Sequence, residues 1–221
     1  MEFNDVFNSE NRFFSMMNKV WDMVVLNLLF LVTVIIGIGP AASALYYAVA
    51  KNIRRSRGYA TKSFFHAFKL NFKQGVIIGI LQLVAAFSLY YCYWFAMSMK
   101  EGNTITQVYM ALWFVFTLLF LFMSVYIYPV LSRFSMSVPS LLKMSFVLSL
   151  RHLPSTLVMV AMIVLEFLAA YLIPPLLTIV VICGASLYVL LKSLMMERIL
   201  KRYIKKPEEG EEVPADAWYL E

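Results

Sequence analysis

The sequence predicts an all-α protein, a polytopic transmembrane helix bundle of about five spans with one further amphipathic helix on the cytoplasmic side. Hydrophobic residues make up 62% of the 221-residue chain and charged residues 14%, against roughly 45–50% and 25% in soluble domains. A helix of roughly 20 apolar residues crosses the hydrocarbon layer of a bilayer. Stretches without any charged side chain cover residues 23–50, 75–99, 102–132 and 167–191, with a shorter one at 152–165.

Prolines and glycines divide these stretches into five predicted spans. Pro174 and Pro175 separate the last two spans, because two consecutive prolines cannot continue a helix that reaches them. Gly37, Gly39 and Pro40 break the first run similarly, and a new helical segment leaves the membrane after them. The predicted spans are Val20–Gly39, Gly75–Met97, Gln107–Leu131, Pro154–Leu172 and Pro174–Met196.

The spans form one transmembrane domain between two short tails. We place this domain at residues 20–206, the N-terminal tail at 1–19 and an acidic C-terminal tail at 207–221. The C-terminal tail contains two prolines and reads as an extended or disordered end. Neither tail is long enough to bury a core of its own.

Positive charge predicts how the spans are threaded. Segment 51–74 carries seven Lys and Arg residues, segment 133–151 carries three and segment 192–206 carries six, together sixteen of the nineteen in the chain. Short loops rich in Lys and Arg stay in the cytoplasm, so both loops and the C-terminus are predicted to be cytoplasmic. Five spans then place the N-terminus outside. If the break at Gly37–Pro40 is re-entrant, the N-terminus is cytoplasmic instead.

Residues 62–74 predict a basic amphipathic helix that precedes the second span. A helix with this pattern lies in the headgroup layer, or against the bundle, with its cations at the anionic lipid surface. At 3.6 residues per turn, one face carries Phe64, Phe65, Phe68 and Phe72, and the neighbouring face carries Lys62, His66, Lys69 and Lys73.

Three polar side chains within the predicted spans are candidates for function. Glu166 lies near the middle of the fourth span, where a carboxylate is costly unless it is protonated, paired or hydrated. It is either a proton or cation site, a polar contact to a partner helix, or a packing group that hydrogen-bonds a neighbouring helix. Asp22 lies at the end of the first span, where snorkelling to the interface explains it as well as function does. Asn27 on the same helix is placed to cross-link helices by hydrogen bonds.

The other motifs indicate helix packing rather than a catalytic or ligand-binding site. Gly75 and Gly79 have the spacing of a close helix contact, and a contact within the chain is its simplest meaning. Cys92 and Cys183 lie inside spans and read as small apolar residues, without the spacing of a metal site or a disulfide framework. The sequence supports no enzyme, metal site or cofactor, and membrane topology accounts for the net charge of +6 without nucleic acid.

The run from Leu26 to Arg54, followed by FFHAFKLNFKQ, resembles the bacterial YesL-like family of integral membrane proteins. The family is classed as a membrane domain of unknown function. Its members commonly sit in Gram-positive operons with carbohydrate ABC importers and glycan-degrading enzymes. The residues that carry the resemblance are Gly39, Pro40, Ala41, Ala44, Leu45, Tyr46 and Tyr47, and then Phe64, Phe68, Lys69, Asn71, Phe72, Lys73 and Gln74.

The resemblance implies a non-enzymatic accessory protein of a bacterial plasma membrane. Such a protein would bind the permease or ATPase subunits of a carbohydrate ABC importer from the lipid side and the cytoplasmic face. The family supplies no catalytic residues, and the chain lacks the coupling loop expected of an importer permease. Two other functions stay open, namely an independent small transporter or channel in which Glu166 lines a polar path, and a membrane enzyme.

Overall fold

The structure is a computed structural model that describes residues 12–56, 58–99 and 104–203, and these ranges contain helices and no strand. The predicted acidic tail lies outside the described residues. The first four helical elements are α2 (Arg12–Val34), α3 (Ile38–Ala48), the π-helix η1 (Val49–Ile53) and α4 (Ala60–Leu70). They are followed by α5 (Phe72–Met97), α6 (Thr104–Leu131), α7 (Val138–Arg151), α8 (Leu153–Leu172), α9 (Pro174–Ile179), the π-helix η2 (Val180–Gly184) and α10 (Ala185–Leu200).

Five of the described helices are long and apolar enough to cross a membrane, which confirms the predicted all-α class. They comprise Ser15–Val34, α5, α6, α8 and the continuous run Pro174–Leu200. Within the apolar window of each helix, only 17–22% of the residues are buried inside the protein. The rest of the apolar surface faces outward, as it does in a multi-pass membrane protein.

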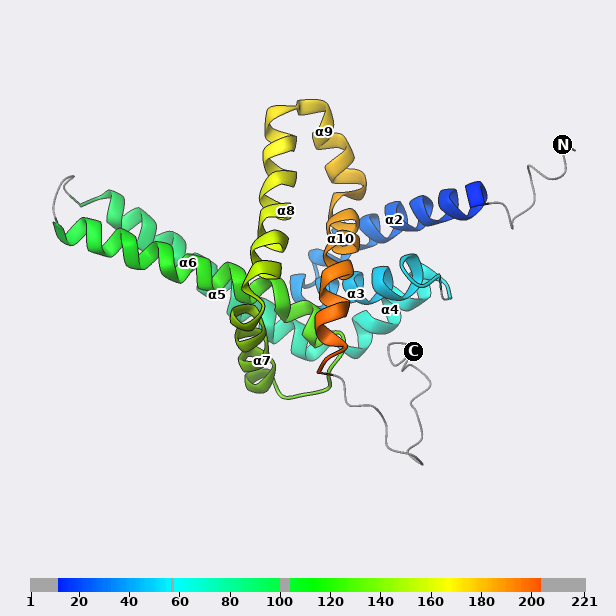
Figure 1. The fold of residues 1–221 in the computed structure, drawn as a ribbon, viewed down its shortest axis with the longest axis horizontal. Coiled ribbons are helices and arrows are strands. Elements are labelled where there is room, and N and C mark those ends of the chain that lie inside the picture. Colours follow the sequence, from blue (N-terminus) through cyan, green and yellow to red (C-terminus); the bar gives the residue numbers. More distant parts are fainter. Residues whose placement is uncertain (1–11, 57, 100–103, 204–221) are drawn as a thin grey trace, which may run out of the picture.

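The long helices meet at one end and separate at the other (Figure 1). The α5–α6 hairpin, the α8–α10 hairpin and α2 extend in three directions from a common core, which we call the hub. The hub consists of α3, α4 and α7 with the adjoining ends of α5, α6, α8 and α10. Burial follows this division in α6, because its buried residues all lie between Phe122 and Leu131, in the last third of the helix.

The start of α3 packs against α5, backbone to backbone. Gly39 and Gly75 lie so close that a Cβ added to Gly39 would overlap the carbonyl group of Gly75. A Cβ on Gly75 would lie 2.6 Å from the nitrogen of Pro40, and one on Gly79 would lie 3.2 Å from the nitrogen of Gly39. The Gly75–Gly79 motif therefore makes a contact within the chain, and its partners are the glycine and proline of the resemblance motif.

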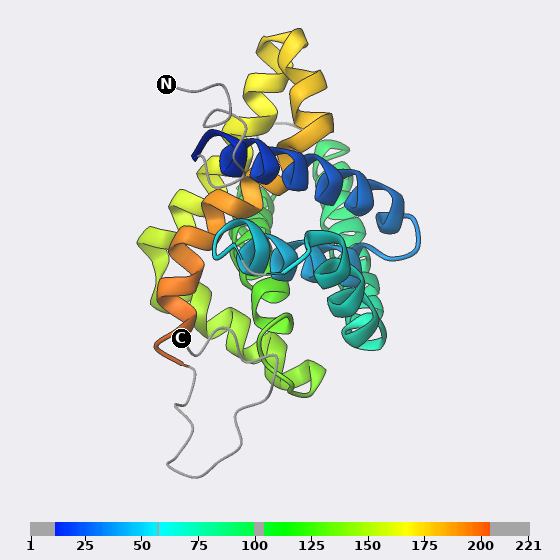
Figure 2. The ribbon, with the colours of Figure 1, turned by 90° about the vertical axis from the view of Figure 1, so that its right-hand side faces the viewer.

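α2 and α3 form an antiparallel hairpin. A turn at residues 35–37 joins them, and α3 continues through η1 back along α2. Figure 2 shows this return from a second direction. The first predicted span thus ends at Val34 rather than at Gly39, because Gly39 and Pro40 begin the returning helix. This geometry favours the re-entrant alternative, in which the N-terminus is cytoplasmic, and the side on which the N-terminus lies stays a prediction.

The predicted amphipathic helix 62–74 is divided between two elements. α4 ends at Leu70, and Asn71 separates it from α5. Phe64 and Phe68 are buried in the core of the hub at 0% and 9% exposure, where α4 packs along α3. The other two aromatic rings, Phe65 and Phe72, stay exposed. α3 can cover the Phe64–Phe68 face of α4 because α3 is rich in alanine, and small side chains let two helices approach closely.

A polar contact holds α2 against the span that contains η2. A π-helix interrupts the regular backbone hydrogen bonding of an α-helix. Asn27 donates from Nδ2 to the carbonyl of Val181 at 2.8 Å, and its Oδ1 accepts from the backbone N–H of Ser186 at 3.2 Å. The Ser186 hydroxyl donates to the carbonyl of Met23 at 2.9 Å. Asn27 thereby satisfies a backbone carbonyl within the interruption and a backbone N–H just after it, where an apolar span offers no water.

We expect Gly75→Ala to destabilise the hub far more than Gly79→Ala. The new methyl group at Gly75 would overlap the α3 backbone, whereas at Gly79 a shift of a few tenths of an ångström suffices. Overpacking of this kind costs about 1–3 kcal/mol, and a backbone clash belongs at the upper end. The thermal unfolding midpoint in detergent measures the difference. An unchanged midpoint for Gly75→Ala would contradict the contact.

We expect residues at the start of α2 and after η1 to lie on the same side of the membrane. Single cysteines at Ser15, Tyr59 and Thr104 test this, in a background without Cys92 and Cys183. An impermeant thiol reagent applied to intact cells, and then to inverted vesicles, should group Ser15 with Tyr59 and leave Thr104 on the other side. Labelling of Ser15 together with Thr104 would instead show that α2 crosses the membrane by itself.

Candidate functional site

The hub encloses a buried carboxylate, Glu197, close to the end of α10. Its side chain is 4% exposed. It accepts hydrogen bonds from the Tyr46 hydroxyl at 2.9 Å and from Nη2 of Arg133, and Nη2 of Arg55 lies 3.9 Å from its other oxygen. We call these four residues the Glu197 cluster.

Each member of the Glu197 cluster comes from a different segment of the chain. The four segments are α3, the turn after η1, the turn after α6 and the last turns of α10. Arg54 extends the same contact, because its Nη1 donates to the carbonyl of Ser193 at 2.7 Å. The cluster therefore joins the first third of the chain to its last helix, since Tyr46 and Glu197 are 151 positions apart.

The charges of the Glu197 cluster are unequal, with two guanidinium groups against one carboxylate. The side chain of Arg133 is 1% exposed and that of Arg55 is 19% exposed. Burial, and next the Glu197 charge, hold the pKa of the Tyr46 hydroxyl well above its ordinary 10.0. Tyr46 thus keeps its proton and serves Glu197 as a donor.

A cleft of about 930 Å³ opens beside Arg133, between the α4–α5 junction and segment 132–137. We call it the basic cleft. Its described lining contains three cations, Lys69, Lys73 and Arg133, and no Asp or Glu. Because the Arg133 side chain is buried, the two lysines supply the accessible charge. The uncharged polar residues of the lining are Tyr47, Asn71, Gln74, Ser132, Ser135 and Ser137.

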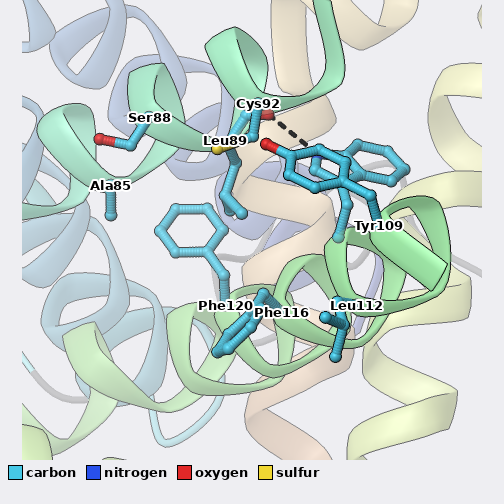
Figure 3. A pocket seen from close by; sticks show the side chains of 9 residues that line it. Ala85, Ser88, Leu89, Cys92, Tyr109, Leu112, Phe116 and Phe120 are labelled. Atoms are coloured by element: carbon cyan, nitrogen blue, oxygen red, sulfur yellow. Dashed lines mark hydrogen bonds between the residues drawn. The ribbon is translucent and has the colours of Figure 1, made fainter. Parts of the chain in front are cut away.

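An apolar pocket of about 500 Å³ lies between α5 and α6, outside the hub. Figure 3 shows Ala85, Ser88, Leu89 and Cys92 on its α5 wall, and aromatic rings from α6 on the other. The indole of Trp113 donates to the carbonyl of Leu89 at 2.8 Å and closes one side. The lining is apolar apart from isolated hydroxyl and thiol groups, which suits a lipid acyl chain better than a polar substrate.

Glu166 lies on α8 with its carboxylate against Gly184 of η2, where a side chain would overlap it. It interacts electrostatically with Tyr188, one turn further along α10. The ammonium group of Lys192 in turn lies 5.5 Å from the Tyr188 ring centre. Gly184, Tyr188 and Lys192 follow at intervals of four residues and therefore share one helix face. This face runs from the middle of the span towards the hub.

Of the other predicted site residues, one belongs to the Glu197 cluster and several line the basic cleft. Asp22 is half-buried on α2 and remote from the Glu197 cluster in the sequence. Tyr46 belongs to the cluster itself, and Tyr47 lines the basic cleft, where its hydroxyl accepts from Lys51 at 3.2 Å. Lys69, Asn71 and Lys73 line the same cleft. The structure thus brings together motif residues that lie more than 20 positions apart.

Sequence reasoning missed Glu197 and the role of Arg133. Within residues 23–206 the acids are Glu101, Glu166 and Glu197, and Glu197 stands alone in a segment of cations. A lone acid at the basic end of an apolar span is a signal for a buried ion pair. The sequence cannot say which of the surrounding cations is its partner, because Arg133 lies 64 positions away.

The helices and the hub define an all-helical, multi-pass membrane protein. Comparison with known families finds a DUF624 domain at residues 23–93, a family described as a protein of unknown function. The matched segment runs from α2 into α5 and contains Asn27, Tyr46 and the α4–α5 wall of the basic cleft. No curated protein and no solved structure matches the chain. Within the described residues, no group of three or more His, Cys, Asp or Glu side chains is placed to hold a metal ion.

We expect Glu197→Gln to destabilise the protein by about 3–5 kcal/mol, because it breaks the buried ion pair with Arg133. Arg133→Met should cost a similar amount, and the double variant should cost less than the sum of the two. Lys143→Met removes an exposed cation and serves as the control. The midpoints of thermal unfolding in detergent form a double-mutant cycle. Strict additivity would show that the two side chains do not interact.

Proposed function

We propose that the protein is a non-enzymatic accessory subunit of a carbohydrate ABC importer in a bacterial plasma membrane. It would bind the permease through its spans and the ATPase at the face that carries the hub. The proposal rests on one structural observation, the separation of the long helices away from the hub. The family resemblance supplies the identity of the partner.

The separated helices offer surfaces on which other transmembrane helices can pack. Phe87 on α5 is 69% exposed and Tyr171 on α8 is 83% exposed, and they belong to hairpins that extend in different directions (Figure 1). Apolar surface alone does not drive association in lipid, so recognition depends on shape and on polar contacts. Hairpins held rigidly by the hub would present such a shape to a partner.

The proposed orientation places the hub at the cytoplasmic face. Segments 51–74 and 133–151 and the end of α10 carry most of the cations and belong to the hub. The positive-inside rule assigns such segments to the cytoplasm. The C-terminus is then cytoplasmic, and the ATPase of an importer also works on that side.

Photo-crosslinking in cells that express the importer tests the accessory function. A photoreactive amino acid at Phe87 or Tyr171 should give an adduct with the permease, and permease and ATPase should co-purify with the chain in mild detergent. The same variants in a strain without the permease serve as the control. Absence of both the adducts and the co-purifying subunits, at normal protein level, would refute the proposal.

The line of Glu166, Tyr188 and Lys192 favours a second candidate, a small transporter that moves protons or cations. The two candidates differ in what they require of Glu166. An accessory subunit should tolerate Glu166→Gln, because the amide keeps the shape and the hydrogen bonding, and should be partly defective with Glu166→Leu. A transporter should lose function with Gln. Uptake of the importer's carbohydrate in strains with each variant measures this, and complete loss with Gln would favour the transporter.

A further inference from the structure

The basic cleft is notable because its described lining contains three cations and no Asp or Glu. Lys69 and Lys73 are exposed at its α4–α5 wall. The guanidinium group of Arg133 lies buried beside the cleft. Glu197 is the carboxylate that faces both Arg133 and Arg55. An anion bound in the cleft would be held by the exposed Lys69 and Lys73, which supply the accessible positive charge of the lining.

Neutral donors surround the two lysines. Asn71 and Gln74 stand on the same wall, and Ser135 and Ser137 stand on the opposite one. Gln74 joins the two walls, because its Nε2 donates to the carbonyl of Met136 at 3.1 Å. Several donors arranged around cations match the oxygens of a phosphate group, which accepts many hydrogen bonds at once.

The N-terminus of α7 borders the basic cleft. α7 begins at Val138, directly after Ser137, and its first turn contains no acidic residue. The N-terminus of a helix carries partial positive charge and free backbone N–H groups. It therefore reinforces the positive charge of the opposite wall.

The size of the basic cleft points to more than an inorganic ion. Its volume of about 930 Å³ lies within the range of sites for organic ligands, about 300–1,000 Å³. Apolar side chains from Leu70, Leu131, Phe134 and Met136 complete the lining. The ligand should thus join a phosphate to a larger organic group.

We propose that the basic cleft binds a phosphate ester, with Lys69 and Lys73 as its direct cationic contacts. The ester is either the headgroup of an anionic phospholipid, which would enter from the bilayer, or a soluble phosphate ester from the aqueous phase. Both present the same phosphate chemistry to the cleft. This binding needs no importer, so its failure would leave the proposed accessory function standing.

Two preparations of the purified full chain distinguish the sources. In the first, nanodiscs of phosphatidylcholine alone hold the protein, and glycerol 3-phosphate is titrated while the thermal unfolding midpoint and the heat of binding are followed. In the second, nanodiscs also contain phosphatidylglycerol, and native mass spectrometry measures how many of these lipids stay bound. Lys69→Gln/Lys73→Gln is the test variant. Lys62→Gln/Lys143→Gln is matched in charge, uses exposed lysines and leaves the cleft unchanged.

We expect saturable binding in one of the two preparations, weakened at least tenfold by the test variant and less than twofold by the matched variant. Binding of glycerol 3-phosphate in neutral nanodiscs would identify a soluble ester, and selective retention of phosphatidylglycerol would identify a lipid headgroup. Equal losses in both double variants would reduce the effect to general surface charge and overturn the proposal. Absence of saturable binding in both preparations, with the unfolding midpoints of the variants unchanged, would overturn it too.

Discussion

The buried Glu197 carboxylate constrains the whole hub, because a charge removed from water needs cations and donors within hydrogen-bond reach. Arg133, Arg55 and Tyr46 meet this need from three separate segments. Tyr46 can reach Glu197 only if α3 is held in place, and the contact between Gly39 and Gly75 holds it against α5. The ion cluster therefore depends on the close glycine contact, and both lie where the long helices converge.

The hub and the separated helices are suited to different tasks. The hub is basic and rich in polar contacts, whereas the hairpins beyond it present apolar sides along most of their length. Apolar helix surface is compatible with lipid or with other membrane helices, and a basic cleft next to a buried ion cluster is suited to anions. The line from Glu166 to Lys192 is the feature that an accessory function does not explain, so that carboxylate separates the two candidate functions most sharply.

Several contacts of the hub combine a pattern that is visible in the sequence with a partner that only the fold supplies. The aromatic face of residues 62–74 follows the helical period, yet Asn71 breaks the helix and α3 covers Phe64 and Phe68. Asn27 was recognisable as a polar residue in an apolar span, whereas its partners could not be named, because the π-helix η2 that needs it lies 154 positions away. The basic loops predict topology from their composition alone, and the structure adds that Lys69 and Lys73 share a cleft.

The sequence by itself determined the class of protein, the number of long apolar helices and the sites where glycine and proline interrupt them. These properties depend on composition and on local backbone chemistry, which a single segment carries without reference to any other. The tertiary structure alone decided that Arg133 pairs with Glu197, that α3 returns along α2, and that Lys69 and Lys73 face segment 132–137. Such pairings join segments far apart in the chain. They arise from packing and from the need to neutralise buried charge, and neither leaves a pattern within one segment.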